Sequence, residues 1–193
     1  SASPSWKPDI EFFQQALGFR VGNYGMSKWS DLFSPRQLVA LTTFCDLVGE
    51  ALERIQQDAI AAGMVDDSKA LDADGIGATA YAEAVSVYLA FVVNRCADFV
   101  NSLCGGSASN QKVMHLCGKP TLSMAWGFAE ANILANTVGG FVPASEYIAD
   151  CIEKLSPAAG VFAAQGDAQS QTISRFKIIS TDPPYYDNIG YAD

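Results

Sequence analysis

The clearest pattern in the chain is a run of apolar residues, spaced three and four positions apart, that begins just after Ser34. This spacing places the side chains on one face of an amphipathic helix. Ser34 can cap the first turn and Pro35 suits the first helical position, so both residues mark a helix start. The sequence therefore predicts a helix that begins at Pro35 and ends near Gly63. Its apolar face carries Leu38, Leu41, Cys45, Leu47, Val48, Leu52 and Ile55.

Two further segments have helical patterns. Residues 78–104 are apolar on almost every face through Tyr81–Val93, which favours a central, buried helix. Residues 143–155 form a shorter pattern, with Pro157 beyond it as a stop. The polar, glycine-containing stretch 64–77 connects the first two helices, and a glycine- and serine-rich stretch ends the second. The chain is therefore predicted to be mainly α.

The middle of the chain is ambiguous, whereas its end has a clear pattern. In the middle, every second residue of one stretch is a large apolar one, as in an extended segment, but neighbouring Ala and Glu residues suit a helix equally well. The alternating residues are Met124, Trp126 and Phe128. Residues 175–180, "RFKIIS", are short and apolar at their end, as central parallel strands are. We therefore expect a helical domain over residues 1–165 and a strand followed by a turn over residues 166–193.

Composition and charge bound the possible functions. With 193 residues, 49% of them hydrophobic and 17% charged, the chain is long and apolar enough to bury a core. Its formal net charge at pH 7 is -9 and its pI is about 4.5. An acidic surface attracts phosphate backbones poorly, so this chain alone should not bind DNA strongly.

The cysteines suggest a reducing compartment. Five cysteines are spread along the chain without a C-x-x-C pair, and the single histidine, His115, lies two residues before Cys117. A zinc site at His115 and Cys117 is one interpretation, and we favour the other, buried reduced thiols in a cytosolic protein with no metal. The chain shows no secretory signal, and its longest apolar run, near 84–93, is too short to cross a bilayer. We therefore expect a cytoplasmic protein without a membrane partner. The other cysteines are Cys45, Cys96, Cys104 and Cys151.

The predicted strand runs into a turn, Asp182-Pro183-Pro184-Tyr185, with distinctive chemistry. Ligands of open parallel sheets bind outside the carboxyl ends of the strands. Asp182 offers carboxylate oxygens, and the two prolines stiffen the backbone so that their carbonyl groups keep fixed directions. Tyr185 offers a flat face for stacking. Rigid hydrogen-bond acceptors beside an aromatic ring suit an exocyclic amino group on a flat heterocycle.

This turn resembles the catalytic D-P-P-Y signature of amino-group DNA methyltransferases, the adenine-specific class especially. The longer stretch "TDPPYYDNI" (residues 181–189) is similar to a subgroup of large adenine methylases with a long helical insertion before this motif. The segments "YGMSKWSDLFSPRQLVALTTF" (residues 24–44) and "MAWGFAEAN" (residues 124–132) also resemble that subgroup. The resemblance thus extends over most of the chain and implies a helical insertion that ends in one strand of a Rossmann-like methyltransferase sheet.

The resemblance also implies roles for the residues of the turn. The target base would be flipped out of the duplex, and the Asp182 side chain and the Pro183 carbonyl would accept hydrogen bonds from its amino group. These acceptors would stabilise the positive charge that develops on the nitrogen during methyl transfer from S-adenosylmethionine. Tyr185 would stack on the base. Tyr186 and Asn188, with Asp187 between them, would line the substrate pocket.

A glycine-rich turn for S-adenosylmethionine should follow a first strand. The only candidate, Gly75-Ile76-Gly77, follows a polar stretch that is not a strand, so we interpret it as a loop. We therefore expect the chain to be an internal fragment of a larger methyltransferase, inactive alone, with the cofactor turn and the DNA-binding surface elsewhere in that enzyme. The alternative is a helical scaffold or interaction module without chemistry of its own.

Two other segments are open to a nucleic-acid interpretation. Trp126, Phe128, Glu130 and Asn132 would form a nucleotide-contacting surface, although we favour a core stripe with polar flanks. The loop "GNYGMSKW" (residues 22–29) would contact DNA, although we favour an ordered glycine-rich turn that packs Trp29. The loop residues concerned are Tyr24, Met26, Lys28 and Trp29.

Overall fold

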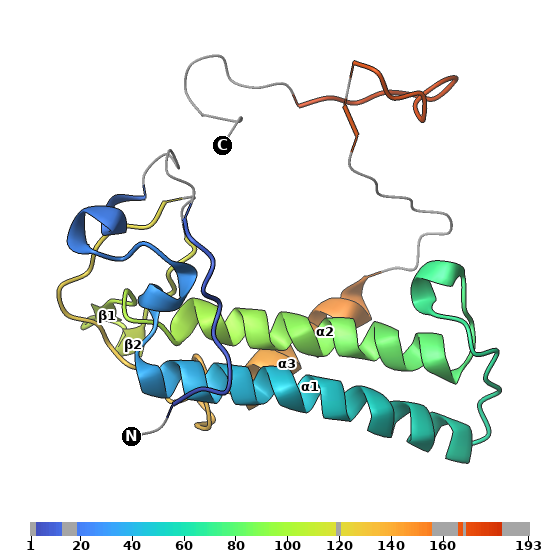
Figure 1. The fold of residues 1–193 in the computed structure, drawn as a ribbon, viewed down its shortest axis with the longest axis horizontal. Coiled ribbons are helices and arrows are strands. Elements are labelled where there is room, and N and C mark those ends of the chain that lie inside the picture. The colour runs from blue at the N-terminus through green and yellow to red at the C-terminus, as the bar shows by residue number, and fades with distance from the viewer. Residues whose placement is uncertain (1–2, 13–18, 119–120, 156–165, 168, 183–193) are drawn as a thin grey trace.

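The computed structural model describes residues 3–12, 19–118, 121–155, 166–167 and 169–182. These residues form three α-helices: α1 (Pro35–Ala61), α2 (Ala78–Phe99) and α3 (Phe141–Lys154). Helices α1 and α2 run antiparallel as a long hairpin, and α3 packs beside α2 (Figure 1). The prediction of a mainly helical chain is confirmed.

Short elements complete the described fold. The 3₁₀ helices are η1 (Arg20–Tyr24), η2 (Trp29–Leu32) and η3 (Leu71–Ala73). One two-stranded antiparallel pair, β1 (Gly106–Ser107) with β2 (Lys112–Val113), follows α2. Because η1, η2 and this pair all lie at the end of the hairpin where α1 begins, that end is thicker than the rest (Figure 1).

Helix α1 begins where the sequence predicted. The Ser34 N–H donates to Oε1 of Gln37 (2.8 Å), and the Gln37 N–H donates to Oγ of Ser34 (3.4 Å), which together make a capping box. Gly63, two residues past the helix, has a φ of 95°, a left-handed conformation that glycine adopts without strain. Local chemistry therefore sets both ends of this helix.

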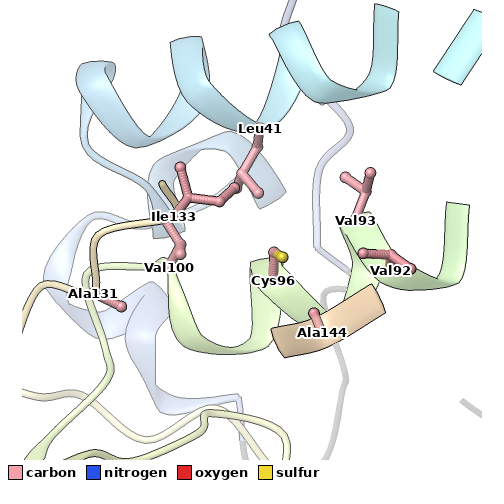
Figure 2. Packing of buried hydrophobic residues seen from close by; sticks show 8 residues of the cluster. All are labelled: Leu41, Val92, Val93, Cys96, Val100, Ala131, Ile133 and Ala144. Carbon is pink, nitrogen blue, oxygen red and sulfur yellow. The ribbon is translucent and has the colours of Figure 1, made fainter. Parts of the chain in front are cut away.

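The main hydrophobic core joins the three helices to the loop that precedes α3. Figure 2 shows side chains from all four parts of the chain meeting in this core. The rings of Phe44 on α1 and Phe141 on α3 also stack, with centroids 4.4 Å apart. The eight buried residues are Leu41, Val92, Val93, Cys96, Val100, Ala131, Ile133 and Ala144.

Helix α2 is central, as predicted, but the prediction that it is buried is only partly right. Tyr81, Tyr88 and Phe91 on this helix are 48%, 37% and 51% exposed. The helix is central, because it contacts both α1 and α3, but two neighbouring helices cover only part of its circumference. A helix of this composition needs a third covering element to be fully buried.

A second, smaller cluster lies at the thick end of the hairpin. Four side chains are buried there, and the rings of Phe12, Phe19 and Trp29 meet edge to face around them. The buried residues are Val21, Leu32, Leu103 and Leu122. In the segment 112–141, which the sequence left undecided, residues 112–113 form β2 and Phe141 begins α3. The described residues between them have neither helix nor strand, and they pack against this cluster and lead into α3.

The predicted strand at 175–180 is not present. Residues 173–176 form a turn, residues 178–180 have no regular structure, and Phe176 and Ile178 are fully exposed. A strand needs a neighbour for its backbone N–H and C=O groups. Within the described residues the only sheet is the β1–β2 pair, so this segment has no neighbouring strand there. A Rossmann-like strand therefore remains a proposal.

No helix among the described residues is both long and apolar enough to cross a membrane.

Candidate functional site

The D-P-P-Y turn lies at the edge of the described chain. Asp182 is described and exposed, whereas Pro183, Pro184, Tyr185, Tyr186 and Asn188 lie outside the described residues. The backbone hydrogen bonds found for residues 166–182 are all local, between residues three or four positions apart. Among the described residues, this segment therefore makes no backbone hydrogen bond to the helical body.

A second candidate site is formed by two segments that are far apart in sequence. The Arg36 guanidinium donates from Nε and Nη2 to the two carboxylate oxygens of Glu130, at 2.6 and 2.5 Å. The rings of Tyr24 and Trp126 meet edge to face, with centroids 5.0 Å apart and an interplanar angle of 81°. Thus segments 24–44 and 124–132, which are far apart in the sequence, contact each other, and no local sequence signal predicted this.

The contact rests on a packed base. Tyr24 ends η1, and Gly25 follows it in the left-handed conformation, with a φ of 88°. The Arg20 N–H donates to the Leu122 carbonyl (3.0 Å), and Val21, between Arg20 and Tyr24, is fully buried. The hydrogen bond and the buried Val21 therefore bring together the segments that carry Tyr24 and Trp126, called the aromatic pair below.

The large apolar residues of the two segments differ in how exposed their side chains are. Trp29 packs against the second cluster, as the ordered-turn interpretation predicted, and Met26 packs there as well. Trp126 is 80% exposed and Phe128 is 37% exposed, so the prediction of a core stripe is wrong for both residues, and Tyr24 is 51% exposed. The structure places Trp126 outside because Met124 and Ala125 already face the cluster from this segment.

The remaining polar residues of the two segments have local partners. Lys28 Nζ lies 3.2 Å from Oδ1 of Asp9, so its charge is balanced. The Asn132 side chain accepts a hydrogen bond from the Leu134 N–H (3.0 Å), which makes it part of a turn. Arg36 holds the pKa of the Glu130 carboxyl below its usual value through their hydrogen bonds and charge. Glu130 therefore stays ionised as a clamp rather than serving as an acid.

The His115 and Cys117 region forms a hydrogen-bonded turn around Asp98. The Cys117 N–H donates to Oδ1 of Asp98 (2.6 Å), and His115 Nδ1 lies 3.5 Å from Oδ2. Desolvation of the sulfur by nearby atoms and the neighbouring Asp98 raise the pKa of the Cys117 thiol to about 11, although the residue is exposed overall, and this disfavours a nucleophilic thiolate. Across the described part of the chain, no three His, Cys, Asp or Glu side chains are grouped to hold a metal ion.

The cysteines are free, but fewer are buried than expected. Cys96 and Cys104 are buried, and burial raises the pKa of both thiols to about 11. Cys45, Cys117 and Cys151 are exposed, which corrects the prediction of uniformly buried thiols. The two buried thiols therefore serve as apolar packing.

The Gly75-Ile76-Gly77 stretch is a loop, as predicted, and does not fit a cofactor. A Cβ atom on Gly77 would lie 2.5 Å from the backbone nitrogen of Asp67, and one on Gly75 would collide with the Lys69 carbonyl. The loop's own backbone thus fills the space that a cofactor would need. The described residues offer S-adenosylmethionine no glycine-rich turn after a strand.

Charge is unevenly distributed along the chain. Residues 41–75 hold eight of the 21 acidic residues and only two of the 12 basic ones, Arg54 and Lys69. Residues 1–40 instead hold four basic and three acidic residues. The acidic residues of 41–75 are Asp46, Glu50, Glu53, Asp58, Asp66, Asp67, Asp72 and Asp74. The thick end with the aromatic pair is therefore not part of the acidic surface that the net charge suggested.

Comparison with known proteins adds no relative. No protein-family model, curated protein or solved structure matches the chain.

Proposed function

We propose that this chain contributes the catalytic turn and a helical insertion to an S-adenosylmethionine-dependent DNA methyltransferase that acts on the exocyclic amino group of adenine. The single observation that carries the proposal is the complete Asp182-Pro183-Pro184-Tyr185 signature at the end of an apolar segment. The exposure of Asp182 supports it, because a carboxylate that must reach a flipped base cannot be buried in the helical body.

The chain's own groups would act on the amino group of the base. The Asp182 carboxylate and the Pro183 carbonyl accept hydrogen bonds from that group and orient its nitrogen. Positive charge develops there as the nitrogen gains a methyl group, and acceptors already in place stabilise it without reorganising. The Tyr185 ring stacks on the base, while Tyr186 and Asn188 line the pocket. S-adenosylmethionine is the methyl donor of this enzyme class, and we propose that its main binding turn belongs to another part of the enzyme.

The test compares Asp182→Ala with a matched exposed carboxylate, Asp150→Ala on α3, in a longer polypeptide that contains this chain and methylates DNA. Asp182→Ala should lower the single-turnover methylation rate by roughly 10²–10³ while cofactor binding is kept, because only the transition state loses an acceptor. Asp150→Ala should leave the rate unchanged. Wild-type turnover of a stably folded Asp182→Ala enzyme would disprove the assignment of this turn.

The second candidate function is a helical scaffold, and one observation favours it. The outer face of α2 exposes aromatic side chains, and the guanidinium of Arg95 lies 3.7 Å from the ring centre of Tyr147 on α3. Exposed aromatic residues beside a stacked arginine are typical of protein contact surfaces. Labelled S-adenosylmethionine distinguishes the two functions, because a longer polypeptide should bind it if the chain belongs to a methyltransferase and should not if the chain is only a scaffold.

A further inference from the structure

The aromatic pair has the features of a binding surface rather than of a core. Trp126 is 80% exposed, yet it is fixed edge to face against Tyr24 on a buried, hydrogen-bonded base. Tyr24 is itself 51% exposed, so both rings present surface on which a flat ligand can lie.

We propose that Tyr24 and Trp126 form a stacking platform for an unpaired DNA base, separate from the catalytic turn. The choice of DNA rests on the proposed function, since an enzyme that takes a base out of the duplex also leaves bases unstacked around it. Aromatic side chains on a fixed surface hold such bases by stacking, with little dependence on sequence because every base has a flat face. A rigid tryptophan loses little conformational freedom when a base stacks on it.

The charge near the platform is compatible with a nucleic acid. Arg20 begins η1, the element that carries Tyr24, and it is exposed with no ion-pair partner found among the described residues. The strongly acidic stretch 41–75 runs along α1 to the opposite end of the hairpin (Figure 1). A DNA strand bound at the platform would therefore lie near Arg20 and away from the acidic end of the hairpin. Electrostatic repulsion at the platform is then too weak to oppose base stacking.

The test measures binding of the 193-residue chain to two fluorescent probes: a single-stranded oligothymidylate of about ten nucleotides and an abasic deoxyribose-phosphate oligomer of the same length. The chain should bind the oligothymidylate about tenfold more tightly than the abasic oligomer, because only the former has bases to stack. Trp126→Ala and Tyr24→Ala should each reduce this preference, Trp126→Ala more strongly because Trp126 is the more exposed ring.

Trp6→Ala is the matched control. Trp6 is 46% exposed, and its indole N–H donates to Asp46 (3.1 Å). The Trp6→Ala variant therefore lacks an exposed tryptophan that is not part of the platform. This variant should keep the preference for bases. Trp126→Leu, which keeps an apolar side chain without an aromatic face, should behave like Trp126→Ala. Thermal melting should show that both Trp126 variants remain folded.

Three results would overturn the platform: equal affinity for the two probes, an unchanged preference in Trp126→Ala, or self-association of the chain that Trp126→Ala abolishes. The last would identify the pair as a contact between copies of the chain. None of these measurements involves methyl transfer. If the longer polypeptide does not methylate DNA but the chain still prefers the oligothymidylate, only the proposed function is refuted. If methylation depends on Asp182 but the chain shows no preference for bases, only the platform is refuted.

Discussion

The two ends of the helical hairpin are both irregular, but different forces hold them. The thick end, residues 20–34 with 100–118 and 121–135, is organised around buried apolar residues such as Val21 and Leu32. In the distal loop, residues 62–77, the only buried residue is Gly77, which has no side chain, and carboxylates organise the backbone. Asp66 accepts from the Thr79 N–H (3.0 Å) and Asp67 from the Ile76 N–H (3.2 Å).

This difference predicts how the stability of each end responds to substitutions and to pH. An apolar cluster is stabilised by area removed from water, so its stability depends on side-chain volume and little on pH. A loop that carboxylates hold depends on their ionisation and on backbone space, and it tolerates changes to its exposed apolar residues. The aromatic pair lies at the thick end, where the segments that carry it pack on the second cluster.

The largest expected loss of stability comes from truncating a buried side chain at the thick end. Leu32→Ala removes a side chain that is 2% exposed and keeps the backbone carbonyl, which accepts hydrogen bonds from the N–H and the hydroxyl of Ser102 at 2.8 Å each. The free energy of unfolding should fall by about 2–4 kcal/mol, measured by urea denaturation. Leu71→Ala, at an apolar position in the distal loop that is 45% exposed, should change it by less than about 0.5 kcal/mol. Equal losses would contradict the comparison.

An intermediate effect is expected from backbone crowding in the distal loop. Gly77→Ala would place a Cβ atom 2.5 Å from the Asp67 nitrogen, so the loop must shift, at a cost of about 1–3 kcal/mol. Gly49→Ala is the matched control, because it lies within α1 with no atom within 4 Å of the added Cβ. It should stabilise the chain by about 0.5–1 kcal/mol. Thermal melting of both variants measures the contrast, and a Gly77→Ala variant as stable as the wild type would show that the loop is not tightly packed.

The smallest effect concerns pH. Hydrogen bonds from Thr79 and Ile76 hold the pKa of the Asp66 and Asp67 carboxyls below the 3.8 of a free side chain. Since the folded pKa is depressed, the stabilisation is present above pH 3.8 and is lost as the pH falls through the folded values. The amide resonances of Thr79 and Ile76 should therefore shift in acid before that of Arg20, whose N–H donates to the neutral Leu122 carbonyl. Simultaneous loss of all three signals would indicate global unfolding instead.

Local patterns predicted the helices well and the site only in part. The capping box of Ser34 and Gln37 and the position of Gly63 lie within a few residues of the ends they set, so the bounds of α1 could be predicted. The Gly75–Gly77 loop was also predictable, because the polar stretch before it cannot be a buried strand. The catalytic roles of Asp182 to Tyr185 come from resemblance and remain predictions.

By itself, the sequence determined where the helices α1, α2 and α3 lie, because periodicity, caps and stops act over one or two turns. Only the tertiary structure decided which apolar residues are covered. It buries Val21 and exposes Trp126, although both sit in short apolar segments, because burial depends on which distant segments meet. It also gives residues 175–180 no neighbouring strand within the described part of the chain, because strand pairing depends on two segments and cannot be read from one.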